Sequence, residues 1–184
     1  MLSKMPITLI LALTVSFFGF SLYNASYLTG SKYVGVKTCG MCHKKESVGQ
    51  QLKIWQESKH AQAYKTLQTE EADKIAKDKG FKTKAADTPE CLKCHVSGYD
   101  VDPSLLGNNF KIEDGVQCET CHGPGSEYKS KKVMKDKKLA IVNGLILYDN
   151  PEELCVKCHN EESPGFKGFN FEERWAKIKH SIPN

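Results

Sequence analysis

Four short segments of the chain share the pattern Cys-x-x-Cys-His, and together they contain all eight of its cysteines. They are Cys39-Gly-Met-Cys42-His43, Cys91-Leu-Lys-Cys94-His95, Cys118-Glu-Thr-Cys121-His122 and Cys155-Val-Lys-Cys158-His159. The pattern is typical of covalent haem c attachment, in which each thiol adds to a haem vinyl group and the histidine becomes an axial ligand of the iron. One helical turn places the two sulfurs about a porphyrin edge apart, with the imidazole beneath the metal. The sequence therefore predicts four covalently attached haem c groups.

Two other chemistries use the same residue types. A single Cys-x-x-Cys pair can be half of a zinc site or a thioredoxin-like redox pair. Here every pair is followed by a histidine, and no cysteine is left over. We therefore expect neither zinc nor disulfides.

The count of axial ligands divides the four predicted haems into two kinds. Four irons offer eight axial positions, whereas the chain has six histidines. Four of these are the motif ligands His43, His95, His122 and His159. Because imidazole is the commonest sixth ligand, we expect the other two, His60 and His180, to bind iron as well. Two irons are then left without a second histidine.

The sequence contains other donors for these two irons. Met134 is the best of them, because a thioether ligand is known in cytochromes c, although we favour an ordinary gap-filling role for this side chain. A lysine such as Lys131, Lys132 or Lys135 binds iron only after it loses its proton. We interpret the lysine-rich run at residues 129–138 as a solvated surface that faces a partner.

The elements that must position these ligands are predicted to be short helices. Thr88-Pro89-Glu90 precedes Cys91, and Asn150-Pro151-Glu152 precedes Cys155. In both segments a capping side chain is followed by proline at the first helical position and then by an acid, which indicates the start of a helix. We expect these helices to carry haem.

Two further elements are predicted between the motifs. The longest helix is expected to run from Ser58, as its N-cap, to Gly80. The dipeptide Asn143-Gly144 lies between apolar runs and predicts a β-hairpin within residues 138–148. The predicted fold class is therefore mainly α, a multihaem cytochrome c with four covalently bound haems as core and one small β-hairpin.

The composition fits a chain that is built around its cofactors. The chain has 184 residues, and 9% of them are aromatic. This is too little apolar side chain to form an ordinary core around four macrocycles. We expect the haems to form much of the core, and the chain without haem to be largely disordered.

The net charge argues against a nucleic-acid partner. The formal value of +4 becomes about −4 when the two propionates of each haem are added. Only Arg174 is an arginine among the 26 basic residues, which disfavours planar recognition of phosphates or bases. The lysines are better interpreted as partners of propionates and as docking surfaces for redox-partner proteins.

The N-terminus predicts export. A weakly basic start is followed by apolar residues from Ile7 to about Tyr23, which is typical of a secretory leader. We assign residues 1–26 to a signal peptide or N-terminal membrane anchor, and residues 27–184 to a tetrahaem cytochrome domain. Because the apolar stretch is also near the minimum length of a membrane span, membrane association through this segment stays open. The predicted location is the periplasm.

Three stretches of the chain resemble the tetrahaem cytochrome c-554 family of ammonia-oxidising bacteria. They are CGMCHKKESVGQQLKIWQESKHAQAYKTL from Cys39, CLKCHVSGY from Cys91 and GVQCETCHGPGSEY from Gly115. The resemblance implies a mostly helical multihaem fold with closely packed haem pairs, and electron transport in the periplasm. It also implies that His60 pairs with His159 and that His180 pairs with His122.

The resemblance leaves the other two irons different from each other. It implies that the second haem, bound by His95, is five-coordinate. In the family a histidine about ten residues after the third motif ligates the first haem, but residues 126–132 of this chain contain no histidine. The iron bound by His43 therefore lacks its expected partner. Met134, a lysine, water or a ligand from a neighbouring chain remain open as substitutes.

Three functions are compatible with these features. The first is a periplasmic electron carrier, which needs close haems but no acid–base residues. The second is a haem enzyme that reduces a small nitrogen oxide or a related ligand at an open iron. The third is a membrane-anchored tetrahaem quinol oxidase, which the motif contexts fit less well. We expect the first, and leave enzymatic activity uncertain with no catalytic residue assigned.

Overall fold

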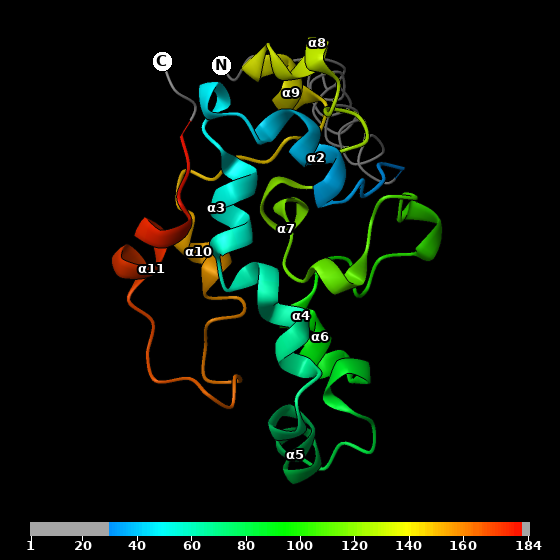
Figure 1. Ribbon diagram of the computed structural model, residues 1–184, viewed down its shortest axis with the longest axis vertical. Coiled ribbons are helices and arrows are strands. Elements are labelled where there is room, and N and C mark those ends of the chain that lie inside the picture. Colours follow the sequence, from blue (N-terminus) through cyan, green and yellow to red (C-terminus); the bar gives the residue numbers. More distant parts are fainter. Residues whose placement is uncertain (1–29, 182–184) are drawn as a thin grey trace, which may run out of the picture. The chain divides into compact units, whose positions relative to one another are not determined.

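Short helices joined by loops make up almost all regular structure in residues 30–181, the part of the chain that the computed structural model describes (Figure 1). Of these, residues 32–181 belong to one structural unit. The predicted leader and the predicted boundary after residue 26 lie outside the described residues. Among those described, no helix has the length and apolar character needed to cross a membrane.

The helices follow one another with few long connections. The α-helices are α2 (Val36–His43), α3 (Gln51–Glu57), α4 (Ala63–Leu67), α5 (Glu70–Asp78), α6 (Pro89–His95), α7 (Cys118–His122), α8 (Lys131–Met134), α9 (Lys137–Val142), α10 (Glu152–Cys155) and α11 (Phe171–Ile178). The 3-10 helices are η1 (Glu46–Val48), η2 (His60–Gln62), η3 (Ala85–Asp87), η4 (Pro103–Leu105) and η5 (Ile112–Asp114).

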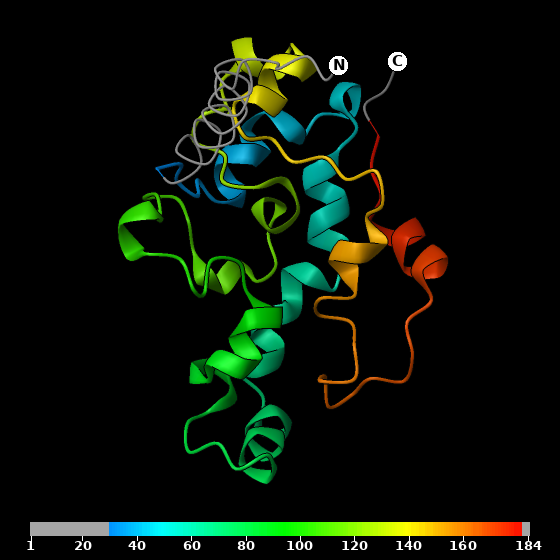
Figure 2. The ribbon, with the colours of Figure 1, turned by 180° about the vertical axis from the view of Figure 1, so that it is seen from behind.

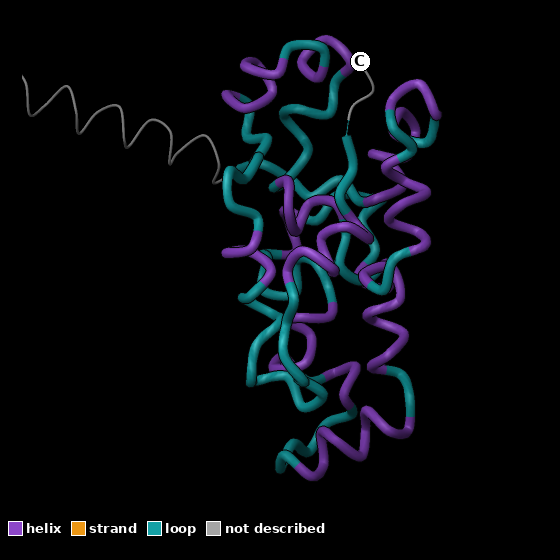
Figure 3. The backbone as a smooth tube through the Cα atoms, turned by 90° about the vertical axis from the view of Figure 1, so that its left-hand side faces the viewer, coloured by secondary structure: helices purple, strands orange, loops and turns teal. Residues whose placement is uncertain are grey.

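The mainly helical fold class is confirmed. Within the described part, β-structure is limited to one isolated parallel bridge between Tyr33 and Leu106, and no strand appears along the tube of Figure 3. The bridge is made by two hydrogen bonds of 2.8 Å, from Tyr33 N to Leu105 O and from Gly107 N to Tyr33 O.

The predicted β-hairpin is wrong, because its first half is helix α9. The Asp136 side chain caps this helix by accepting a hydrogen bond from Leu139 N. Helix α9 ends at Gly144, which has a φ of +98°. The N–H of Gly144 donates to Ile141 O, and the N–H of Leu145 donates to Ala140 O. This pair of bonds is the Schellman arrangement. An Asn-Gly pair suits both a hairpin turn and a helix end because both need a positive φ, so the dipeptide alone does not distinguish them.

The predicted single helix from Ser58 to Gly80 is also wrong. Ser58 ends α3, where its N–H and hydroxyl both donate to Trp55 O. The chain then turns through η2 and α4 before Thr69 starts a new helix, α5, by accepting from Ala72 N. Three acids in the first turn of α5 add favourable charge at its N-terminus. The Thr69 cap therefore starts a separate helix, although the helical periodicity continues across the whole segment from Ser58 to Gly80.

The helices that carry the motifs form where they are predicted. Helix α6 begins at Pro89 after Thr88, as the capping pattern indicates. Helix α10 begins at Glu152, one residue later than expected, with Pro151 in the N-cap position. Motifs one, two and three end in helices α2, α6 and α7, and motif four continues from α10 into a turn. Each motif histidine is thereby placed at or just beyond the end of a short helix.

Buried side chains are few and small. Between residues 30 and 181 the buried hydrophobic residues are Val34, Val36, Ala61, Leu67, Ala76, Ala85, Val96, Tyr128 and Ala140. One group of them, Leu67, Ala76 and Ala85, packs under α6 with Leu92 and Cys91 at its edge. Four of the nine are alanines, so the polypeptide supplies little apolar volume of its own.

Candidate haem site

His60 is fixed through its backbone next to the segment that leads into the third motif. It begins η2, and its carbonyl oxygen accepts a hydrogen bond of 3.1 Å from Val116 N. Gly115 allows this close approach, because a Cβ at that position would lie 2.6 Å from His60 O. Trp55 adds a second tie, donating from Nε1 to Val116 O over 2.8 Å. The side chain of His60 is thus presented from a rigid turn.

The structure brings His60 to His159. Their ring centres lie 6.1 Å apart, and the ring of His159 also stacks on Phe169 at 4.8 Å with an angle of 11°. Burial of the His60 ring and then the neighbouring His159 lower the pKa of His60. Burial and then Arg174 lower the pKa of His159. Both effects favour neutral imidazole, the form that ligates metals.

The structure also brings His122 to His180, with ring centres 5.8 Å apart. His180 follows α11, which packs against α3; both ribbons run side by side in two opposite views (Figure 1 and Figure 2). Asn170 caps α11 by accepting from Glu173 N. The C-terminal segment is therefore held so that His180 reaches the third motif.

The two ring separations fit imidazoles on opposite sides of one metal. A metal–imidazole bond is about 2 Å long and the ring centre lies about 1 Å behind the ligating nitrogen, so two axial rings have centres about 6 Å apart. Coordination through a central iron meets this geometry. Direct stacking of the rings does not, since their planes are tilted by 44° and 59°.

The Nδ1 atoms of several histidines already have partners. They lie 2.8 Å from Ala63 O for His95, 3.1 Å from Ile146 O for His122 and 3.1 Å from Ile178 O for His180. A carbonyl oxygen only accepts, so Nδ1 of each ring carries the proton and Nε2 keeps its lone pair. This is the arrangement by which an outer partner orients a metal-binding histidine.

His43 and His95 have no second imidazole opposite them. The other four of the six histidines are taken up by the two pairs, and no ring contact of His43 or His95 occurs among the described residues. Met134, the alternative ligand, is half-buried at the end of α8. The structure thus separates the motif histidines into two that are paired and two that are not.

The cysteines of different motifs lie next to one another. None of the eight forms a disulfide with another. A hydrogen bond to Cys118 raises the pKa of Cys39 and, in return, lowers the pKa of Cys118. The first and third motifs are therefore adjacent, in agreement with the packing of α2 against α7.

Two more contacts extend this series. Burial and the neighbouring thiol of Cys155 raise the pKa of Cys121 to about 11. Burial and then Cys94 raise the pKa of Cys158 to about 12. The third motif is thus within electrostatic range of the fourth, and the fourth adjoins the second. The third motif also adjoins the second directly, because Thr120 Oγ1 lies 2.5 Å from Ser97 Oγ, two residues after His95.

The donor set fits haem c. Within residues 30–181, no group of three or more His, Cys, Asp or Glu side chains is placed to hold a metal ion. A haem iron needs only two protein ligands, because the porphyrin supplies the others. The motif cysteines and the facing histidines match that need.

A model of the family described as cytochrome c554 and c-prime matches residues 38–123. Cytochrome c-554 of Nitrosomonas europaea is 31% identical to the chain over 160 residues. The chain belongs to the cytochrome c-554 family. The alignment covers 78% of this chain and 64% of the relative, so the chain spans about two thirds of that protein's length. No solved structure matches the chain significantly.

Membership of the cytochrome c-554 family implies covalently bound haem c. The family match at residues 38–123 includes the first three motifs and His60. The fourth motif and His180 lie beyond it.

The sequence patterns did not indicate a role for Glu119, a buried residue of this cytochrome c-554 family member. It is one of the two variable residues between Cys118 and Cys121, and it is 2% exposed. Its carboxylate accepts three backbone hydrogen bonds, from Val34 at 2.8 Å, Gly35 at 2.8 Å and Gly125 at 2.7 Å. Burial raises the pKa of Glu119, and these three N–H groups oppose the rise.

Gln117 completes this arrangement. Its side-chain oxygen accepts from Val36 N at 3.0 Å, and its amide nitrogen donates to Lys111 O at 2.8 Å. Two side chains of the third motif region therefore bind three successive N–H groups at the start of α2. They fix the first motif relative to the third.

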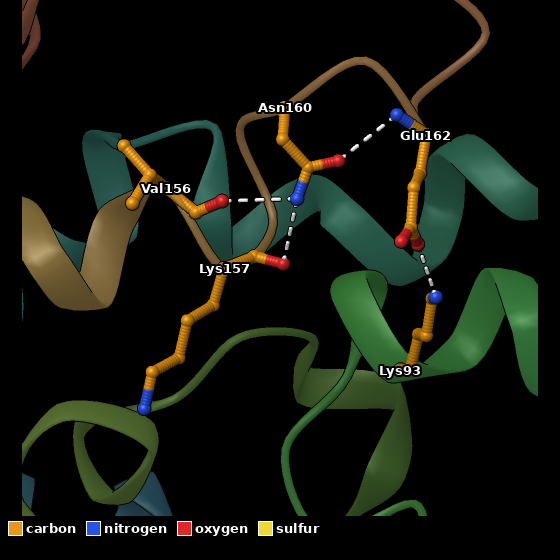
Figure 4. A network of polar contacts seen from close by, with 5 residues as sticks. All are labelled: Lys93, Val156, Lys157, Asn160 and Glu162. Carbon is orange, nitrogen blue, oxygen red and sulfur yellow. Dashed lines mark hydrogen bonds and ion pairs between the residues drawn. The ribbon is translucent and has the colours of Figure 1, made fainter.

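A polar network fixes the second motif relative to the fourth (Figure 4). Asn160 donates to the carbonyl oxygens of Val156 and Lys157 and accepts from Glu162 N. Glu162 in turn forms an ion pair of 2.5 Å with Lys93, which lies between Cys91 and Cys94. The loop after the fourth motif is thereby tied to the helix of the second.

Proposed function

We propose that this chain is an exported electron carrier that binds four haem c groups and passes single electrons between redox-partner proteins. The four pairs of motif cysteines would attach the haems. His43, His95, His122 and His159 would bind the irons, and His60 and His180 would complete two of them. Bound haem c supplies a one-electron iron couple.

The observation that carries this proposal is the closeness of the four motifs in space. Cys39 is hydrogen-bonded to Cys118, Cys158 is hydrogen-bonded to Cys94, and Ser97, just after the second motif, contacts Thr120 within the third. Tunnelling falls steeply with distance, and neighbouring motifs bring the attached macrocycles close together. An electron that enters beside the first motif would therefore have a route through the third motif to the second and on to the fourth.

The chain's own residues support transfer in a second way. The Glu119 carboxylate and the Lys93–Glu162 pair each join two neighbouring motifs. Such ties keep distances between motifs constant. Electron transfer needs this constancy, and it needs no proton donor beside the iron.

The experiment is a haem count followed by a redox titration of the purified holo-protein. We expect four haems per chain by absorbance of the pyridine complex and by mass, and four electrons taken up reversibly. Three or fewer haems, or a haem that does not exchange electrons with the others, would overturn the proposal. A variant with Cys91→Ser and Cys94→Ser is the control, and it should lose one haem and one electron.

A second function rests on the two unpaired histidines. His43 and His95 face no second imidazole, so the irons they bind are candidates for binding a small nitrogen oxide or a related ligand. Nitric oxide is added to the reduced holo-protein and the spectrum is followed. A spectral change and consumption of nitric oxide support this haem-enzyme function, whereas an unchanged spectrum eliminates it.

The location and membrane association are proposed from the N-terminus. We expect residues 1–26 to direct the chain to the periplasm, where donor and acceptor proteins meet the folded domain. N-terminal sequencing of the mature protein distinguishes a cleaved leader from a retained anchor. A cleaved leader also excludes the membrane-anchored quinol oxidase.

A further inference from the structure

His43 differs from the other histidines in the partner of its Nδ1 atom. His95, His122 and His180 contact backbone carbonyl oxygens, as described above. The Nδ1 of His43 instead lies 3.2 Å from Oε1 of the Gln51 side chain. A backbone carbonyl is the same whatever the residue, but a side-chain acceptor can differ from one sequence to another.

The orientation of the Gln51 amide follows from its second contact. Its Nε2 donates to Val48 O at the end of η1. Because a carbonyl oxygen cannot donate, the amide nitrogen must face Val48 and the amide oxygen must face His43. The Nδ1 of His43 therefore carries the proton, and Nε2 keeps the lone pair that a metal needs.

The backbone before Gln51 is shaped to hold this side chain in place. Gln50 has φ 51° and ψ 33°, and it is the non-glycine residue with positive φ in the described part of the chain. Its N–H donates to Lys45 O over 3.1 Å, which closes the loop after the first motif. The left-handed turn makes Gln51 the first residue of α3. A strained conformation that is retained in this way is a mark of a functional position.

We propose that Gln51 is a positioning residue that sets the tautomer and the donor strength of His43, and through them the reduction potential of the iron that His43 binds. A hydrogen-bond acceptor at Nδ1 gives the ring more imidazolate character and makes it a stronger donor. A stronger donor stabilises ferric iron and lowers the potential. This inference rests on the proposed attachment of haem at Cys39 and Cys42.

The effect is largest where the motif histidine stands alone. The iron on His122 or His159 would share its charge between two imidazoles. The reduction potential of the iron on His43 would depend on one imidazole ring. A change in the donor strength of this ring would therefore not be diluted by a second imidazole. Gln51 is thus placed to tune one of the four potentials separately.

The test compares two substitutions that should shift the reduction potential in opposite directions, each with a matched control. Gln51→Leu removes the acceptor, and Gln51→Glu makes it a stronger, charged acceptor. Gln56→Leu and Gln56→Glu make the same changes at an exposed position of the same helix. The potentials of all four haems are measured by spectroelectrochemical titration, and the haem content of each variant is counted.

We expect Gln51→Leu to raise one potential and Gln51→Glu to lower the same one, each by about tenfold in the reduction equilibrium, or about 59 mV for one electron. The other three potentials and both Gln56 variants should remain near those of the wild type. Shifts in the same direction in both Gln51 variants would indicate a merely structural role and would overturn the proposal. So would the absence of any shift.

Failure of this inference is distinguishable from failure of the proposed function. If the wild-type protein holds fewer than four haems, the proposed function fails; if it holds four and no potential responds to Gln51, only the inference fails. If both Gln51 variants lose haem, the Nδ1 proton of His43 in the wild-type protein is measured by nuclear magnetic resonance. Slow exchange with solvent supports the hydrogen bond, and rapid exchange overturns it.

Discussion

The Oε1 atom of Glu119 lies 2.8 Å from the backbone nitrogen of Val34, so a carboxylate within the third motif binds the segment that begins the helix of the first. The partners are 85 positions apart in the chain. The same carboxylate also binds Gly35 and Gly125. Its contacts therefore join the segment before the first motif, the third motif and the segment after it.

We predict that Glu119→Ala lowers the free energy of unfolding of the holo-protein by about 3 kcal/mol or more, because it leaves three buried N–H groups without an acceptor. Glu90→Ala is the control, since Glu90 is exposed in the first turn of another motif helix, α6. Denaturant titration followed by circular dichroism measures both. Equal losses in the two variants would show that the buried hydrogen bonds are not responsible.

Replacing His60 by alanine should convert one low-spin haem to high spin while the haem content stays at four. His180→Ala should do the same for a different haem, and the double variant should show both changes. The reason is that each iron keeps its motif histidine but loses the imidazole placed opposite, at 6.1 or 5.8 Å between ring centres. Low-temperature electron paramagnetic resonance counts the spin states. Gln62→Ala, an exposed change in η2, should leave the spectrum unaltered, and an unaltered spectrum for His60→Ala would contradict the pairing with His159.

The Lys93–Glu162 ion pair predicts a local response to acid. The hydrogen bond to Lys93 lowers the pKa of Glu162 below its ordinary value of 4.5. A carboxylate with a lowered pKa in the folded protein contributes stability above its unfolded pKa and loses it as the pH falls through the folded value. Both side chains are exposed, so the global melting temperature should barely change.

The readout for this pair is amide hydrogen exchange in residues 160–169. We expect smaller protection factors there, after correction for the intrinsic pH dependence of exchange, below about pH 4 in the wild type, and equally small protection factors at pH 7 in Glu162→Gln. Glu161→Gln removes a neighbouring exposed carboxylate and should leave the exchange slow at pH 7. Slow exchange in Glu162→Gln at pH 7 would show that Asn160 alone holds the loop.

Removal of the cofactors should unfold most of the chain. A variant with all eight motif cysteines changed to serine is expected to show weak helical circular dichroism and no cooperative melting, because the buried apolar residues in the described part are few and mostly small. The holo-protein measured under the same conditions is the reference. A cooperative thermal transition in the variant would mean that the polypeptide forms a sufficient core without haem.

Local patterns were predicted well where one mechanism explains them. The helix start at Thr88-Pro89 agrees with the structure because proline at the first helical position acts within one turn, although the Thr88 hydroxyl donates to Lys84 O instead of capping the helix. The segment around Asn143-Gly144 was predicted wrongly, because its positive φ serves a Schellman helix end as readily as a hairpin turn. The cap at Asp136, which lies outside the dipeptide, decides between them.

The Ser58–Gly80 prediction failed for a related reason. Periodicity extends across the whole segment, but Ser58 and Thr69 use their side chains to end one helix and begin another. The same residue types serve as helix starts and as helix ends. Only their actual hydrogen-bond partners reveal which role each one has.

The sequence by itself determined which chemical groups are available: four Cys-x-x-Cys-His motifs and six histidines, two of them outside the motifs. These features are local, because a haem-attachment motif lies within five consecutive residues. Tertiary structure decided which motifs are neighbours, which histidines face each other and which partner each Nδ1 has. Glu119 and Gln51 gained their roles in the same way. Their contacts depend on how distant segments or a left-handed turn place two groups a few ångströms apart, and no pattern of residue types along the chain encodes that distance.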